Sequence, residues 1–291
     1  MRGWAESRRG GLTLVLTRRC PVRCGFCPQS FEDKDMSPAV LDASLRSLGR
    51  RFGDSGPIKL FGGEPLVRPD LVRQAVLGAA RLGLKGGVLL STHGKLMAPA
   101  MVRFLRGHPE VEVAFGRPSP WAGRLPRVTL NFILEPGARA EVVLRRLRRS
   151  LALGHKSFNF LPVYFIPWKA GDLAGLRRSL AGLARLIKGL RKAGMALEVK
   201  NLRRQGRLPL YNDGPCVDTD GTVYCSNLVL AKGMKPLAEV LRLGSVARPR
   251  LKAAPSPAAL GSVMTACFSP EAMEGTRAAD AALSEFVHDL R

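Results

Sequence analysis

Short apolar runs alternate along the chain with longer stretches in which apolar residues recur every three or four positions. The short runs predict strands at 12–17, 58–61, 86–92, 111–115, 128–134 and 158–165. The longer stretches predict helices at 38–50, 70–82, 97–106, 138–153 and 172–193. Because helices of this length carry the chain back between parallel strands, the alternation predicts an α/β sheet or barrel.

The pattern changes after about residue 200. Residues 212–230 predict a β-hairpin, with Asp220 and Gly221 at its turn. The stretch 247–262 is rich in Pro, Ala and Ser and predicts irregular chain, and a last helix is expected at 270–290. We therefore expect a core at 10–200 and a smaller C-terminal extension at 201–291 that contains the hairpin.

Composition and charge narrow the class of protein. The chain is 46% hydrophobic, and no apolar run approaches the ~18–20 residues of a membrane-spanning helix. No apolar signal segment is visible at its start, so we expect a cytoplasmic protein without a membrane partner. The net charge of +23 favours acidic peptides or polyanions as partners. Solvated helix faces explain the charge equally well, and a nucleic-acid patch at the RRLRR run, residues 145–149, stays open.

The candidate chemistry begins with the stretch LTRRCPVRCGFCPQS, which places Cys20, Cys24 and Cys27 in one short loop after the first expected strand. Thiols this close in sequence cannot staple distant segments, which favours metal binding over disulfides. A closed metal site needs four protein ligands, whereas three leave a coordination position open for a reacting molecule. A zinc site completed by a distant His or Cys is the alternative.

Two further loops follow the next expected strands. The first is GGEP, residues 62–65, and the second is STHG, residues 91–94. In parallel α/β barrels the carboxyl ends of the strands form the rim that carries the chemistry, so these loops are expected beside the cysteines. Glycines allow a ligand to approach the backbone closely, and Glu64 offers a carboxylate to a charged ammonium.

Together, CPVRCGFC, FGGEP and STHG resemble the motifs of the radical S-adenosylmethionine (SAM) superfamily over residues 10–200. The resemblance implies a partial (β/α)6 TIM-like barrel with a small C-terminal extension. It implies a 4Fe–4S cluster on Cys20, Cys24 and Cys27. It also implies that SAM contacts the residues Gly62, Gly63, Glu64, Pro65 and Thr92. His93 stands where the family usually has Asn, so a cofactor role for His93 is left open.

The same resemblance implies the chemistry. An electron donor such as flavodoxin or ferredoxin would reduce the cluster, which would cleave SAM to methionine and a 5′-deoxyadenosyl radical that abstracts hydrogen from a substrate. The residues name no catalytic acid or base. Four residues are expected near the mouth of the barrel, where core packing explains the aromatic pair equally well: Asn131, Asn159, Tyr164 and Trp168.

Three cysteines remain, namely Cys216, Cys225 and Cys267. PCVDTDGTVYC resembles the start of the SPASM or twitch extension of radical SAM enzymes that modify peptides, which implies one auxiliary 4Fe–4S cluster on these cysteines. Metal-free buried thiols are the alternative. The leading expectation is modification of a peptide or protein side chain. A small metabolite, an RNA, and a non-catalytic iron–sulfur carrier are the other candidates, and GGEP argues against the carrier.

Overall fold

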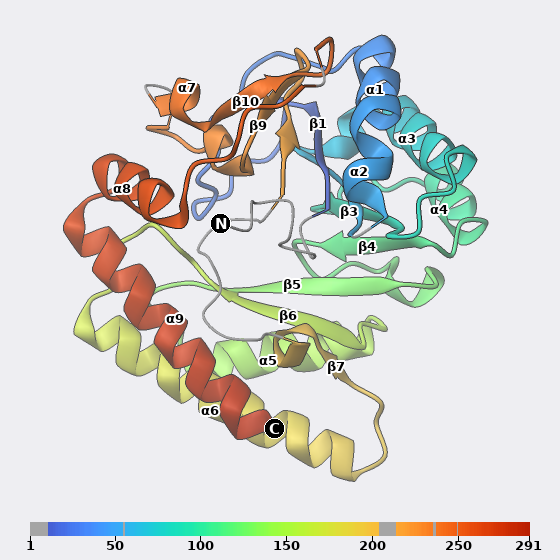
Figure 1. Ribbon diagram of the computed structural model, residues 1–291. Helices are drawn as coiled ribbons and strands as arrows, with labels where there is room; N and C mark the ends of the chain where they lie inside the picture. Colours follow the sequence, from blue (N-terminus) through green and yellow to red (C-terminus); the bar gives the residue numbers. More distant parts are fainter. Residues whose placement is uncertain (1–10, 55, 204–213, 235–236, 249) are drawn as a thin grey trace. The chain divides into compact units, whose positions relative to one another are not determined.

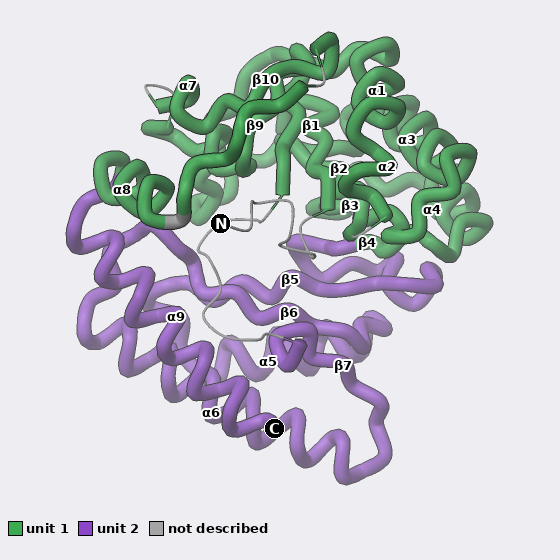
Figure 2. The backbone as a smooth tube through the Cα atoms, viewed as in Figure 1, with its two compact units in different colours: residues 1–113, 209–267 green, residues 114–208, 268–291 purple. Residues whose placement is uncertain are grey.

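A computed structural model describes residues 11–54, 56–203, 214–234, 237–248 and 250–291 of the chain (Figure 1). The chain forms two compact units, and each is built from segments far apart in sequence (Figure 2). Unit 1 comprises residues 1–113 and 209–267, and unit 2 comprises residues 114–208 and 268–291. These units are defined by contacts and interleave along the sequence. The division predicted from the sequence, a core at 10–200 and an extension at 201–291, stays a prediction.

Unit 1 contains a sheet with the strand order β10-β9-β8-β1-β2-β3-β4. The strands are β1 (Thr13–Thr17), β2 (Ile58–Gly62), β3 (Val88–Thr92), β4 (Val111–Phe115), β8 (Cys216–Val217), β9 (Thr222–Tyr224) and β10 (Arg242–Ser245), and only residues 111–113 of β4 belong to unit 1. Strand β1 runs parallel to both β2 and β8, whereas β9 runs antiparallel to β8 and to β10. All five residues of β1 are buried, as expected for a strand covered on both faces.

Most helices of unit 1 connect these strands, and α8 follows the last strand, β10. The helices are α1 (Pro38–Ser44), the π-helix η2 (Leu45–Gly49), α2 (Arg50–Gly53), the 3-10 helix η3 (Pro65–Val67), α3 (Pro69–Arg81), α4 (Pro99–Arg106), the 3-10 helix η6 (Asn227–Leu230), α7 (Ala238–Leu241) and α8 (Pro257–Cys267). Helix α3 shows why they form where they do. Pro69 starts it, Asp70 lies in its first turn and Arg81 in its last, which suits the helix dipole. Leu71 and Val76 are fully buried on its inner face.

Unit 2 combines three parallel strands with helices. Its elements are η4 (Ala122–Arg124), β5 (Val128–Leu134), α5 (Ala140–Ala152), β6 (Ser157–Pro162), α6 (Ala170–Lys192), β7 (Glu198–Val199), η5 (Lys200–Arg203) and α9 (Pro270–Leu290). Strand β6 lies between β5 and β7. Helix α9 returns from the C-terminal end of the chain to pack on α6 and β6, where Phe286 meets Phe160 edge-on at 5.2 Å between ring centroids. No helix of the described residues combines the length and the apolar character that a membrane span requires.

Most predicted elements are confirmed, with two corrections. The strand predicted at 158–165 ends at Pro162, because the chain turns at Phe165, which has φ 63° and donates its N–H to Thr276 Oγ1 at 2.7 Å. The irregular chain predicted for 247–262 is wrong from Pro257 onward, where α8 begins. The Oγ of Ser256 accepts a hydrogen bond from Ala259 N at 3.2 Å and so starts this helix. The hairpin is confirmed in β8 and β9, although residues 212–213 of the predicted stretch lie outside the described residues.

Candidate functional site

The three N-terminal cysteines lie in the loop that directly follows β1 in unit 1. All three are partly buried, and the Cys27 N–H donates to the Cys24 carbonyl at 3.0 Å, which makes a tight turn between them. Burial raises the pKa of the Cys20 thiol and of the Cys27 thiol. A thiolate is the form that binds metal, so a positive metal centre is what would offset this cost of burial.

The donor set fits a cluster better than a single ion. Within the described ranges, no three His, Cys, Asp or Glu side chains are grouped so that they could hold one metal ion. A 4Fe–4S cluster does not require such convergence, because each thiolate binds a different iron atom. Three partly buried thiols in one loop supply the three thiolates of a cluster with one open iron, whereas a closed zinc site needs a fourth ligand.

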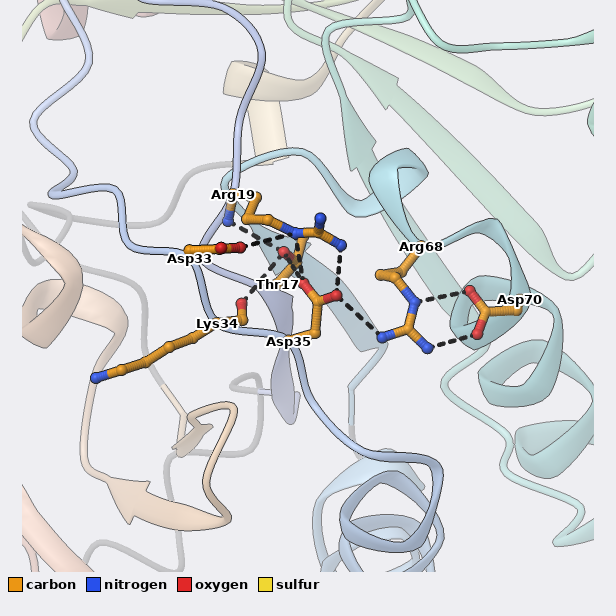
Figure 3. A network of polar contacts seen from close by, with 7 residues as sticks. All are labelled: Thr17, Arg19, Asp33, Lys34, Asp35, Arg68 and Asp70. Carbon is orange, nitrogen blue, oxygen red and sulfur yellow. Dashed lines mark hydrogen bonds and ion pairs between the residues drawn. The ribbon is translucent and has the colours of Figure 1, made fainter.

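A polar network fixes the start of this loop (Figure 3). The carboxylate of Asp35 accepts hydrogen bonds from Thr17 Oγ1 at 2.6 Å, from the Arg19 guanidinium, and from Arg68 Nη1 at 3.1 Å. Arg68 in turn donates two hydrogen bonds to Asp70 at the start of α3. Burial raises the pKa of Asp35, but the hydrogen bonds from Thr17, Arg19 and Arg68 outweigh it and leave this pKa below its usual value.

The glycine loop after β2 presses against the same segment. A Cβ on Gly62, which has φ 142°, would lie 2.1 Å from the Thr17 carbonyl oxygen, and a Cβ on Gly63 would lie 2.2 Å from that of Arg19. The Gly63 N–H donates to the Thr17 carbonyl at 2.9 Å, and the Glu64 N–H donates to the Arg19 carbonyl at 2.9 Å. Two glycines are therefore required here, because any side chain would push the loops apart.

Glu64 links the second and third loops of the candidate site. Its side chain is buried, and its Oε1 accepts from Leu66 N at 3.0 Å and from Thr92 Oγ1 at 2.7 Å. Its Oε2 accepts from His93 N at 2.8 Å and lies 3.3 Å from His93 Nε2. The structure thus brings together Glu64, Thr92 and His93, and the contact of Glu64 and Thr92 with SAM stays a prediction.

The C-terminal cysteines occupy a different environment in unit 1. Cys216 in β8 is fully buried, and Cys225 directly after β9 is nearly so. Burial raises the pKa of Cys225 to about 11 and raises that of Cys216 still further. Cys267, at the end of α8, donates its thiol to the Gly233 carbonyl at 3.7 Å. The auxiliary cluster on these residues stays a prediction.

The residues expected near a barrel mouth all lie in unit 2. Asn159 Nδ2 donates to Asn131 Oδ1 at 3.1 Å across β5 and β6. The Tyr164 hydroxyl donates to Asp280 Oδ1 at 3.0 Å, and the buried Trp168 donates Nε1–H to the Val163 carbonyl at 2.9 Å. Contacts with α9 and with their own loop thus account for the polar atoms of the two aromatic residues.

The chain is similar to known proteins, and the matched residues include the three N-terminal cysteines and the GGEP loop of this candidate site. The model of the Radical SAM superfamily matches residues 14–168, more than half of the chain. PqqA peptide cyclase of Methylorubrum populi is 40% identical over 91 residues, which are 30% of this chain and 23% of that protein. PqqA peptide cyclase of Methylobacterium nodulans is 25% identical over 209 residues, 63% of this chain and 54% of that protein. The matched segment therefore spans about a quarter to a half of the length of these curated relatives.

Solved structures extend the likeness to nearly the whole chain. The structure of anSMEcpe with bound AdoMet has a TM-score of 0.67 at 12% identity, covering 94% of this chain and 84% of that one. Streptococcus suis SuiB bound to S-adenosylmethionine has a TM-score of 0.59 at 13% identity, covering 92% of this chain and 67% of that one. At such identities the likeness concerns the fold, and it confirms the predicted partial-barrel α/β class.

Proposed function

Because this chain belongs to the Radical SAM superfamily, we propose that it is an enzyme that cleaves SAM at a 4Fe–4S cluster and modifies a peptide or protein side chain. The observation that carries the proposal is the three-cysteine loop held against a glycine loop that tolerates no side chain. When bound, the cluster and SAM supply one-electron chemistry that removes a hydrogen atom from a substrate C–H bond.

The protein's own part is to hold the cluster, to orient SAM and to shield both from water. Cys20, Cys24 and Cys27 hold the cluster and leave one iron open for SAM. Gly62, Gly63, Glu64, Pro65 and Thr92 receive SAM. The two glycines let their loop lie directly against Thr17 and Arg19, which precede Cys20. Glu64 keeps Thr92 and the backbone of His93 in a fixed position.

A peptide substrate is supported by the relatives. The matched cyclases are named for the PqqA peptide. The anSMEcpe structures include complexes with peptides, and SuiB has been solved bound to its precursor peptide SuiA. A small metabolite and an RNA are the substrates that the experiment below must distinguish from a peptide.

Two finer parts complete the proposal. A one-electron donor such as flavodoxin or ferredoxin would supply the electron that the cluster requires. One auxiliary 4Fe–4S cluster binds Cys216, Cys225 and Cys267, which is supported by the closeness of Cys216 and Cys225 across the β8–β9 hairpin. Iron binding would deprotonate these thiols despite their burial. Iron retained after Cys20, Cys24 and Cys27 are all changed to Ala would support the auxiliary cluster, and an iron-free variant would contradict it.

The central test is the variant Cys24→Ala. Anaerobically reconstituted wild-type protein, given SAM and dithionite, is expected to form 5′-deoxyadenosine, measured by chromatography, whereas Cys24→Ala forms none. Gly25→Ala is the matched control, because a Cβ there meets no atom within 4 Å. Formation of 5′-deoxyadenosine by Cys24→Ala would refute the cluster assignment.

The substrate class is tested by co-expressing the chain with the short peptide encoded nearest its gene. We expect a change in the mass of this peptide that disappears with Cys24→Ala. If the peptide mass never changes, and a small metabolite or an RNA alone stimulates 5′-deoxyadenosine formation, the peptide proposal is wrong while the superfamily chemistry stands.

A further inference from the structure

The C-terminal stretch of residues 216–232, here called the clasp, contacts both ends of the cysteine loop. It lies outside residues 14–168, which match the superfamily, and the sequence predicts it as a hairpin that resembles the start of a SPASM or twitch extension. We define the cysteine loop as residues 18–30. Both segments belong to unit 1, so the contacts between them lie within one compact unit.

At the start of the loop, the clasp holds Arg18, two residues before Cys20. Arg18 donates Nε–H to Asp218 Oδ1 at 3.0 Å and Nη2–H to Asp218 Oδ2 at 2.5 Å. The two side chains are only 10% and 11% exposed. A paired, charge-assisted interaction of this kind fixes direction as well as distance, and burial protects it from screening by salt.

At the end of the loop, just after Cys27, the clasp adds a short backbone ladder. The Ser30 N–H donates to the Leu230 carbonyl at 2.9 Å, and the Lys232 N–H donates to the Pro28 carbonyl at 2.7 Å. Gln29 and Ala231 form an antiparallel bridge between these two hydrogen bonds.

The clasp is itself anchored to the sheet. Cys216 pairs with Thr13 of β1, and the Thr13 N–H donates to the Pro215 carbonyl at 2.9 Å. Asp218 is held by its own hairpin, since its N–H donates to the Thr222 carbonyl at 2.9 Å and its Oδ1 accepts from Thr219 N at 2.7 Å. The carboxylate that holds Arg18 is therefore positioned before any cluster binds.

We propose that the clasp positions the cysteine loop for cluster binding, with Arg18 and Asp218 as positioning residues. The inference rests on the proposed cluster of Cys20, Cys24 and Cys27, but not on the peptide substrate. It gives the hairpin a role that needs no metal on Cys216 or Cys225.

The first test measures the rate at which an iron chelator removes iron from reconstituted protein. Asp218→Asn is expected to lose iron at least about tenfold faster than wild type, because it loses the charge-assisted pair. Asp220→Asn is the hairpin control, since Asp220 is exposed and its Oδ1 accepts a local hydrogen bond from Thr222 N at 2.8 Å. Val76→Ala, which truncates a fully buried side chain of α3, controls for lost stability. Both controls are expected to release iron at the wild-type rate at a temperature where all variants remain folded.

The second test needs no variant, so it holds even if Asp218→Asn fails to fold. Coupling between two sites is reciprocal, so a cluster that benefits from the clasp must also stabilise the clasp. Amide hydrogen exchange at Lys232 and Asp218 is expected to slow on cluster binding, whereas exchange at Phe160 in unit 2 stays unchanged.

The outcomes separate the two proposals. Wild-type protein that binds no iron, or iron retained undiminished in Cys24→Ala, would overturn the cluster assignment. Wild-type protein that binds iron, with equal exchange at Lys232 and Asp218 in both forms, would overturn the clasp. Iron release from a folded Asp218→Asn at the wild-type rate would overturn it as well.

Discussion

At the scale of single residues, the two glycines of GGEP differ from Gly25 in the space around them. A Cβ at Gly63 would lie 2.2 Å from the Arg19 carbonyl oxygen, whereas a Cβ at Gly25 would meet nothing within 4 Å. We expect Gly63→Ala to lower the free energy of unfolding by about 1–3 kcal/mol, because backbone atoms must move apart. It should also reduce the iron bound on reconstitution.

Urea unfolding followed by circular dichroism, together with iron analysis, checks this prediction. Gly25→Ala lies in the cysteine loop, at a position with room for a Cβ, and is expected to match wild type in both measurements. Equal stability and iron content in Gly63→Ala and Gly25→Ala would show that the close approach of the two loops does not matter.

The residues of the candidate site were only partly predictable. Cys20, Cys24, Cys27 and the GGEP residues are recognisable because their spacing along the chain carries the chemistry. Asp35 and Asp218 were not, because a carboxylate acquires its importance from partners that the fold brings to it, in the case of Asp218 from 200 residues away. In the sequence, Asp218 looked like an ordinary turn residue of VDTDG.

At the scale of elements, the turn between α5 and β6 contains a buried histidine. His155 is fully buried, and its Nε2 accepts a hydrogen bond from Ser119 N at 3.0 Å. Burial lowers its pKa from 6.5 to about 4. The unfolded chain therefore binds a proton in a pH range where the folded protein does not, and stability is lost as the pH falls from 6.5 towards 4.

We expect this residue to contribute up to about 3 kcal/mol to the loss of unfolding free energy over that range. The check compares urea unfolding of wild type and His155→Gln between pH 7.5 and 4.5, read from the fluorescence of Trp121 and Trp168 in the same unit. The variant should show the shallower pH dependence. Parallel pH profiles for the two proteins would contradict the prediction.

The positions of charged residues on the helices predicted less of the structure than the spacing of the apolar residues did. The helices predicted at 138–153, 172–193 and 270–290 lie within two residues of the observed ends of α5, α6 and α9. The basic face of α6 is exposed, as solvated helix faces require: the side chains of Arg177 and Lys188 are 48% and 51% exposed, and they form ion pairs with Glu285 and Asp289 of α9. Arg146 of α5 lies over the ring of Phe132, 4.0 Å from its centroid. Periodicity identifies which face is polar, but it does not identify what packs against that face.

At the scale of the whole molecule, each unit is completed by a segment from late in the sequence, which packs against an earlier part of the same unit. The clasp joins the sheet of unit 1 beside β1, and α9 packs on α6 in unit 2 (Figure 2). The order of elements along the sequence predicts parallel neighbours such as β1 and β2, because such pairs are local in the α/β pattern. It does not predict where the clasp and α9 pack, because their contacts depend on tertiary structure.

The net charge is also a property of the whole molecule, and it bears on the substrate. The chain has 46 Lys and Arg against 23 Asp and Glu, which gives a formal net charge of +23. Such an excess creates a field that attracts acidic ligands and increases their association rate. Salt weakens this field, because the screening length falls to about 3 Å at 1 M ionic strength.

We therefore expect the association rate of an acidic peptide to fall by about tenfold or more between 0.05 and 0.5 M salt, measured by stopped-flow fluorescence. A peptide of the same length with Gln in place of Glu is the control and should bind at a rate nearly independent of salt. Equal salt dependence of the two peptides would show that the excess charge does not steer the substrate. A much steeper dependence for a single-stranded RNA, together with RNA-stimulated formation of 5′-deoxyadenosine, would assign the basic surface to nucleic acid instead.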